Sequence, residues 1–239
     1  MSASFENSRI IIAGGSSGIG LATAALLTAE KAHVTITGRA AERLQEAAKA
    51  VPVAATAVVD GNDRPALDQF FAAQHSIDHL VIALSGAKGA GMFKDLSLDD
   101  LRAGFEGKFW PQLQTLQAAL PYMRPGGSIT MITAISAIAK NPGTAGLAAI
   151  NGAIELMVPG LAKELQPLRI NAVSPGVVDT PWWDFLPADA KADTFKAYAD
   201  QLPTGKVAAA TDIAEAVLFL MRNSNTTGTI LRCDGGFSL

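Results

Sequence analysis

Short apolar or β-branched runs alternate along this chain with longer segments in which apolar residues recur at helical spacing. Seven short runs predict strands, at residues 9–13, 33–37, 54–59, 79–84, 128–133, 169–173 and 229–232. Six longer segments predict helices, at residues 18–31, 40–50, 64–75, 98–123, 147–165 and 212–221. This alternation predicts parallel strands joined by crossover helices on both faces of one sheet. The strand runs are almost continuously apolar, which is typical of strands covered on both faces.

We therefore predict an α/β fold, a doubly wound parallel sheet of about seven strands in a single three-layer domain over residues 1–239. The longest region without a clear period is about 175–209, which contains four prolines. Loops of this length are often functional, so this region predicts a lid or substrate loop. We expect Trp182, Trp183 and Phe185 to roof a substrate pocket.

A glycine-rich loop follows the first predicted strand and leads directly into the first predicted helix. Glycines there permit a tight turn and close backbone approach to a pyrophosphate, and the helix N-terminus offers free N–H groups to the anion. A plain turn is the alternative, but the strand-loop-helix context favours a Rossmann-type dinucleotide site. The predicted contacts are Gly14, Ser16, Ser17, Gly18, Ile19 and Gly20.

Three further strand ends carry candidate cofactor contacts. After the second strand, Gly38 leaves room and Arg39 could bind a 2′-phosphate, which favours NADP(H) over NAD(H), although Arg39 could simply be a solvated residue at a helix start. After the third strand, Asp60 could accept from an adenine amino group, or Asp60 or Asn62 could cap the next helix. After the fourth strand, Ser85 and Gly86 let the backbone approach a ligand.

Charge and composition limit the kinds of molecule that we expect this protein to bind. The net charge is −3, and the 19 lysines and arginines are scattered, so we expect no nucleic acid or anionic membrane as partner. No apolar stretch reaches the ~18 residues of a membrane span on this reading. The single cysteine, Cys233, allows no intramolecular disulfide and is expected to be a buried inert thiol. We expect a cytoplasmic soluble protein that binds a small molecule.

Three motifs together resemble the short-chain dehydrogenase/reductase family over essentially the full chain. The family's Thr-Gly-x-x-x-Gly-x-Gly loop matches residues 13–20 with Ala13 in place of threonine, its Asn-Ala-Val-Ser-Pro-Gly-x-Val-x-Thr-Pro segment matches 171–181, and its Asp-Gly-Gly matches 234–236. The resemblance implies that the backbone of Pro175, Gly176 and Val178 contacts the nicotinamide and its carboxamide, and that Thr180 reaches the carboxamide or the pyrophosphate. It also implies a homo-oligomer, a dimer or tetramer, formed through the helices at 98–123 and 147–165.

The chain departs from the family's catalytic pattern. Leu147 stands at the tyrosine of Tyr-x-x-x-Lys, Asn151 at its lysine, and Ala134 at the partner serine. Lys108 stands where the family carries an asparagine on the earlier helix, so lysine and asparagine are exchanged, as in the similar ketoreductase domains. The candidate catalytic residues are Lys108, Asn151, Ser136 and Thr133, the last two as replacement hydroxyls.

Each candidate has a plainer alternative. Lys108 lies on the apolar stripe of its helix, where a lysine needs a hydrogen-bond partner or a shifted pKa. Alternatively, its stem could lie along the core while its amine reaches solvent. Pro111 should kink that helix. Asn151 could be a surface residue or a partner for a carbonyl freed by Pro159. We predict an NADP(H)-dependent oxidoreductase acting on a carbonyl or alcohol, with a non-catalytic NADP(H) binder as the alternative and a lyase or isomerase as a third possibility.

Overall fold

A seven-stranded parallel sheet forms the centre of the computed structural model, which describes residues 4–53 and 55–239. In spatial order the strands are β3 (Ala55–Val58), β2 (His33–Gly38), β1 (Arg9–Ala13), β4 (Ile77–Ile82), β5 (Met123–Ile132), β6 (Arg169–Pro175) and β9 (Ile230–Cys233). The order reverses between β1 and β4, and a crevice at the carboxyl ends of strands beside such a reversal is where doubly wound proteins bind ligands.

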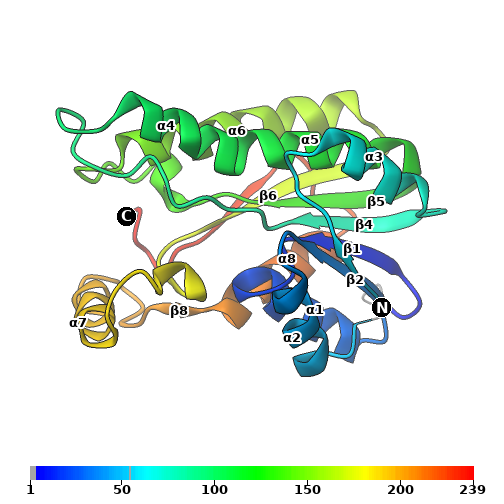
Figure 1. Ribbon diagram of the computed structural model, residues 1–239, viewed down its shortest axis with the longest axis horizontal. Coiled ribbons are helices and arrows are strands. Elements are labelled where there is room, and N and C mark those ends of the chain that lie inside the picture. The colour runs from blue at the N-terminus through cyan, green and yellow to red at the C-terminus, as the bar shows by residue number, and fades with distance from the viewer. Residues whose placement is uncertain (1–3, 54) are drawn as a thin grey trace.

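Helices cover both faces of the sheet, as Figure 1 shows. One layer contains α3 (Arg64–Ala72), α4 (Leu98–Gly104), α5 (Trp110–Ala119) and α6 (Ala145–Glu164), and the other contains α1 (Gly18–Ala29), α2 (Ala41–Ala50) and α8 (Ala210–Arg222). Residues of β1 alternate between the two cores: Ile10 and Ile12 pack with α1, α2 and α8, whereas Ile11 and Ala13 pack with the opposite layer. The predicted fold class is therefore confirmed.

Several predicted boundaries shift. The fourth strand begins at Ile77 and the fifth at Met123, earlier than predicted, and Ala54, the expected start of the third strand, lies outside the described residues. The segment predicted as one helix at 98–123 is divided into α4, a π-helical stretch at Phe105–Phe109, α5 and a 3-10 turn at Leu120–Tyr122. Pro111 lies in the first turn of α5, directly after the π-helical stretch, and it has no N–H to donate to the carbonyl of Gly107, which fits the interruption of regular α-helix there.

The region 175–209, predicted to be a lid or substrate loop, has regular structure over part of its length. It contains β7 (Val178–Asp179), a 3-10 turn at Pro181–Trp183, α7 (Ala188–Ala199) and β8 (Ala208–Ala209), and β7 pairs with β8 in a separate two-stranded sheet. No residue of α7 within the described chain is fully buried, and its half-buried face, at Lys191, Thr194, Phe195 and Tyr198, mixes polar with aromatic residues, so the sequence shows no clear apolar period. In Figure 1, α7 lies beyond the end of the main layers, next to β8.

The prediction that no apolar stretch is long enough to span a membrane is wrong when length and composition alone are considered. Helix α6 has 20 residues, and an 18-residue window within it has a mean hydropathy of 1.4. It packs on β6, however, and carries the polar side chains of Asn151 and Glu155 toward the protein interior. Such a helix is explained by its place in the layered fold.

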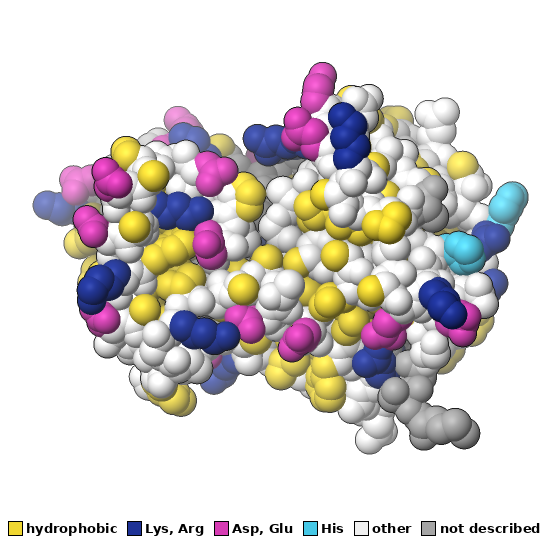
Figure 2. All heavy atoms as spheres, turned by 90° about the horizontal axis from the view of Figure 1, so that it is seen from below, with side chains coloured by type: hydrophobic (Ala, Val, Ile, Leu, Met, Phe, Trp, Pro, Cys, Tyr) yellow, Lys and Arg dark blue, Asp and Glu magenta, His cyan; other side chains and the backbone are white. Residues whose placement is uncertain are grey.

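Charge on the surface is mixed. On the face drawn in Figure 2, basic and acidic side chains are interspersed, with apolar atoms between them. Cys233 is half-buried and not fully buried as predicted, and burial raises the pKa of its thiol, which agrees with an inert thiol.

Candidate active site

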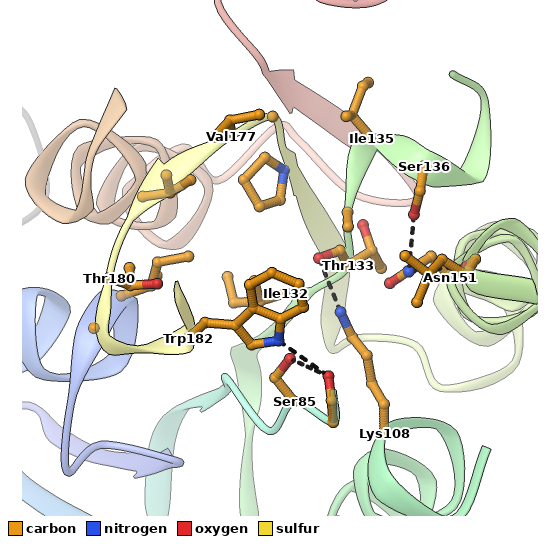
Figure 3. Close-up of a pocket in the computed structure, with 18 of the residues that line it drawn as sticks. Ser85, Lys108, Ile132, Thr133, Ile135, Ser136, Asn151, Val177, Thr180 and Trp182 are labelled. Atoms are coloured by element: carbon orange, nitrogen blue, oxygen red, sulfur yellow. Dashed lines mark hydrogen bonds between the residues drawn. The ribbon is translucent and has the colours of Figure 1, made fainter. Parts of the chain in front are cut away.

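One cavity of about 460 Å³ lies at the carboxyl ends of the central strands (Figure 3). The glycine loop after β1, the loop after β4 and the segments after β5 and β6 line it, together with the π-helical stretch and α6. It therefore brings together predicted cofactor contacts and predicted catalytic residues. Those that line it are Gly14, Ser17, Gly18, Ile19, Gly20, Ser85, Gly86, Lys108, Thr133, Ser136, Asn151, Pro175, Gly176, Val178 and Thr180.

The glycine loop is shaped by backbone contacts that leave no room for side chains. Gly14 has φ +83°, and a Cβ there would lie 2.7 Å from the carbonyl oxygen of Ala83 at the end of β4. A Cβ on Gly20 would overlap the carbonyl oxygen of Gly14. Within the described chain no side chain caps the α1 N-terminus and its first turn contains no acidic residue, so its free N–H groups face the cavity. These features fit the pyrophosphate of a dinucleotide.

The segment after β6 closes against this loop. A Cβ on Gly18, which has φ +53°, would lie 3.3 Å from the side chain of Thr180. At Gly176 a Cβ would lie 2.8 Å from the carbonyl oxygen of Asp234, so the chain also passes close to the Asp-Gly-Gly turn. The motifs at 13–20, 171–181 and 234–236, far apart in the sequence, thus lie against one another, and the first two line the cavity.

The predicted adenosine contacts lie outside the lining of this cavity. Gly38 ends β2 next to Ser16, because a Cβ on Gly38 would lie 3.3 Å from the Ser16 hydroxyl oxygen, and Arg39 follows with an exposed side chain. Asp60 accepts a hydrogen bond from the backbone N–H of Asn62 at 3.0 Å. The capping alternative for Asp60 and Asn62 is wrong, since Asp63 caps α3 by accepting from Ala66 N–H.

The predicted aromatic roof is formed in part. Trp182 and Trp183 line the cavity, and the indole N–H of Trp182 donates to the carbonyl oxygen of Gly86 at 3.2 Å. This contact joins the 175–209 segment to the loop after β4, as Figure 3 shows beside Ser85. Phe185 instead is 64% exposed and packs against Trp182, with ring centroids 5.4 Å apart.

Lys108 lies inside the protein and does not extend to solvent. Its side chain comes from the π-helical stretch, is 8% exposed, and donates from Nζ to the carbonyl oxygen of Thr133 at 3.0 Å. Burial lowers the pKa of Lys108 to about 8, and the Glu155 carboxylate opposes this shift. The interpretation as a surface-reaching lysine is therefore wrong. A buried amine with a pKa near neutrality can give and take protons at physiological pH.

Asn151 points to the same end of β5 from α6 (Figure 3). It is 3% exposed, and its amide N–H group donates to the Ser136 hydroxyl at 3.1 Å and to the Leu147 carbonyl at 3.0 Å. Its carbonyl oxygen, Oδ1, is buried without a hydrogen-bond partner among the described residues. The surface alternative for Asn151 is therefore wrong. Ser136, which accepts from Asn151, keeps its own hydrogen to donate.

The hydroxyl of Thr133, unlike that of Ser136, already donates its hydrogen within the protein. Its hydroxyl donates to Glu155 Oε1 at 2.7 Å and lies 3.2 Å from the carbonyl oxygen of Val173, while its side chain is almost fully buried. One hydroxyl hydrogen cannot also serve a substrate. Of the two replacement hydroxyls, the geometry favours Ser136.

Two polar residues of the site were not identified from the sequence. Glu155 lies four residues after Asn151 and eight after Leu147, so the i, i+4 spacing along one helix face was the available signal. Gln112 is fully buried four residues after Lys108, and its amide donates to the carbonyls of Leu84 and Ile132 at the ends of β4 and β5. Its role as a bracket between strand ends depends on tertiary contacts.

The family comparisons agree with the motifs. Residues 13–238 match the family model described as enoyl-(acyl carrier protein) reductase. The chain is 28% identical to the short-chain dehydrogenase/reductase malC of Malbranchea aurantiaca, covering 96% of this chain and 94% of the relative. It is 30% identical to the L-xylulose reductase of Mesocricetus auratus, covering 96% of each.

Solved structures show the same relationship. A small-chain dehydrogenase in complex with NADPH superposes with a TM-score of 0.85 at 31% identity, covering 98% of this chain and 99% of the other. The MalC reductase/Diels-Alderase of Malbranchea aurantiaca superposes with a TM-score of 0.86 at 26% identity, covering 97% and 95%. Together with the glycine loop and the seven-stranded sheet, these matches show that the chain belongs to the short-chain dehydrogenase/reductase family.

Proposed function

We propose that this protein is an NADP(H)-dependent oxidoreductase that interconverts a carbonyl compound and its alcohol, with Lys108 in the place of the family's tyrosine. The observation that carries the proposal is Lys108 itself, a buried amine in the cavity that the glycine loop also lines. Family membership and the NADPH-bound structural relative support the coarser assignment to the oxidoreductases.

A nicotinamide dinucleotide held by the glycine loop and the 175–180 segment would supply or accept the hydride. The residues in position to hold its pyrophosphate are Gly14 to Gly20, and those toward its nicotinamide end are Pro175, Gly176, Val178 and Thr180. The chain must then align the substrate and manage the charge on its oxygen.

In the reductive direction, Lys108 Nζ donates a proton to the substrate oxygen as hydride reaches the carbonyl carbon. The C=O π bond becomes a C–H and an O–H bond, and Lys108 regains its proton from solvent. A pKa of about 8 suits this step because donor and acceptor forms are both accessible near neutral pH. Ser136 donates a second hydrogen bond to the same oxygen, positioned by Asn151.

We assign the preference for NADP(H) over NAD(H) to residues at the end of β2. The exposed guanidinium of Arg39, beside Gly38 and Ser16, would pair with a 2′-phosphate and so favour NADP(H). Asp60 is the candidate contact for the adenine. We further propose a cytoplasmic homo-oligomer assembled through α4, α5 and α6, acting on a small molecule and on neither nucleic acid nor membrane.

The test is a screen of purified protein for NADPH oxidation over a panel of carbonyl compounds, with parallel titrations of NADPH and NADH binding. We expect NADPH binding and turnover of at least one carbonyl class. NADPH binding without turnover of any carbonyl or alcohol would replace the proposal with a non-catalytic binder. Failure to bind either cofactor would contradict both.

A further inference from the structure

We propose that Glu155 is a positioning residue for Lys108, which fixes Thr133 through its hydroxyl and provides the negative charge that keeps Lys108 protonated. The sequence motifs assign no role to this residue. Its effect on turnover rests on the function proposed above, whereas its effect on the proton affinity of Lys108 can be measured without any substrate.

Glu155 binds two buried hydroxyls that lie at the ends of neighbouring strands. Its Oε1 accepts from Thr133 Oγ1 and from Ser174 Oγ, each at 2.7 Å. Thr133 and Ser174 are 2% and 1% exposed. Short hydrogen bonds to a carboxylate are strong where water is excluded. One carboxylate oxygen on α6 therefore holds the end of β5 and the end of β6 together.

Thr133 connects this bracket to Lys108. Its hydroxyl donates to Glu155, while its backbone carbonyl accepts from Lys108 Nζ at 3.0 Å. Lys108, on the π-helical stretch, and Glu155, on α6, thus both bind Thr133. A shift of Thr133 would move the partner of the Lys108 amine, so Glu155 fixes the position of that amine through Thr133.

The charge of Glu155 acts on the same amine. Burial favours neutral Lys108, and the carboxylate attracts a proton to it, so the pKa of Lys108 falls only to about 8. Replacing the carboxylate with an amide would remove the attraction and keep a carbonyl oxygen for the two hydroxyls. This variant therefore separates the two parts of the proposed role, which are the positioning of Thr133 by hydrogen bonds and the attraction of a proton to Lys108 by charge.

The other charges on elements around Lys108 lie at the surface. Helix α4 packs on the π-helical stretch, and its acidic side chains pair with basic ones: Asp99 with Arg102 at 2.6 Å, and Asp100 with Lys88 at 3.2 Å. Glu106, on the same stretch as Lys108, is exposed. Helix α5 has no ionisable side chain in its sequence. On α6, Lys163 and Glu164 are exposed at its far end, and the lining of the cavity adds Lys88 and Tyr198.

The experiment measures the titration midpoint of Lys108 by NMR of protein labelled with ¹³C at lysine Cε, the resonance being assigned by its loss in Lys108→Met. In Glu155→Gln we expect the midpoint to fall by about 1 pH unit. Glu164→Gln, which removes an exposed carboxylate from the same helix, should leave it unchanged. Ser174→Ala, which removes one hydroxyl but keeps the charge, should also leave it unchanged.

An unchanged midpoint in folded Glu155→Gln would overturn the proposal. If Glu155→Gln does not fold, the double variant Glu155→Gln with Lys108→Met is tested instead. Recovery of folding in the double variant supports the proposed charge balance between Glu155 and Lys108. Failure to recover folding overturns the proposal. With a working substrate, the alkaline limb of the kcat profile should move to lower pH together with the midpoint. A shifted midpoint in a protein that turns over nothing would leave the Glu155 assignment intact and count against the proposed oxidoreductase instead.

Discussion

The two halves of the cavity are built in different ways. Around β1 and β4 the site consists mainly of backbone: Gly14 and Gly20 are required because a Cβ on Gly14 would meet the main chain of Ala83, and a Cβ on Gly20 would meet that of Gly14. Around β5 and β6 it consists of side chains from separate elements, such as Lys108, Thr133 and Glu155, joined by hydrogen bonds. The first half is a rigid cradle that tolerates little change, and the second is a polar network whose chemistry can be altered by one substitution.

The largest expected effect is on the cradle. Gly18→Val should raise the dissociation constants of NADPH and NADH at least about 100-fold, because its side chain would block the pyrophosphate site. The native φ of +53° and the contact with Thr180 add strain. Calorimetric titration measures the loss, with circular dichroism to verify folding.

Gly160→Ala is the matched control, because a Cβ on this α6 glycine meets nothing within 4 Å. It should leave both dissociation constants unchanged and stabilise the helix by about 0.5–1 kcal/mol. Parent-like cofactor affinity in Gly18→Val would mean that the pyrophosphate binds elsewhere.

The next largest effect is on the polar network, where a substitution should increase the stability of the fold. Lys108→Met should raise the free energy of unfolding at pH 7 by on the order of 2 kcal/mol, because a buried charge is removed and the apolar stem is kept. The folded-state pKa of Lys108, about 8, lies below the ordinary lysine value of 10.5. The unfolded chain therefore binds more protons between these values, and parent stability should rise as pH increases from about 8 to 10.5.

Urea unfolding across this pH range measures the difference. In Lys108→Met the Lys108 contribution to that rise should be absent. An equal slope in parent and variant would show that the Lys108 amine is not desolvated in the folded state.

The smallest effect concerns cofactor choice. Arg39→Ala should reduce the preference for NADPH over NADH by about 10-fold, since an exposed contact to phosphate contributes on the order of 1.4 kcal/mol. Lys49→Ala, at the other end of α2, should leave the ratio unchanged. Equal affinities for the two cofactors in the parent protein would remove Arg39 from the assignment.

The difference between the halves also explains what could be predicted from the sequence. The cradle follows from local order, because the strand, the glycine loop and helix α1 are consecutive from Arg9 to Ala29. The resemblance to the family's catalytic motif also placed Lys108 and Asn151 at one site. It did not indicate that the Thr133 hydroxyl is occupied by Glu155, because that contact joins residues 22 positions apart on different elements.

The surface helix α7 was missed for a different reason. Periodicity reports burial, and α7 buries none of its described residues. The π-helical stretch that carries Lys108 was predicted only as a kink at Pro111. In this stretch Gly107 packs closely on Gly86, where an added Cβ would lie 3.2 Å from the Gly107 backbone, and such a tertiary contact has no signal in the sequence pattern.

The central claim, that Lys108 is the proton donor of a carbonyl reductase, is tested most directly by single-turnover kinetics of Lys108→Met with NADPH and a substrate from the carbonyl screen. The account predicts that the rate falls by about 10²–10⁴ while the NADPH dissociation constant changes far less. Lys31→Met, which changes an exposed lysine outside the cavity lining, should keep the parent rate. A parent-like rate in Lys108→Met would contradict the claim.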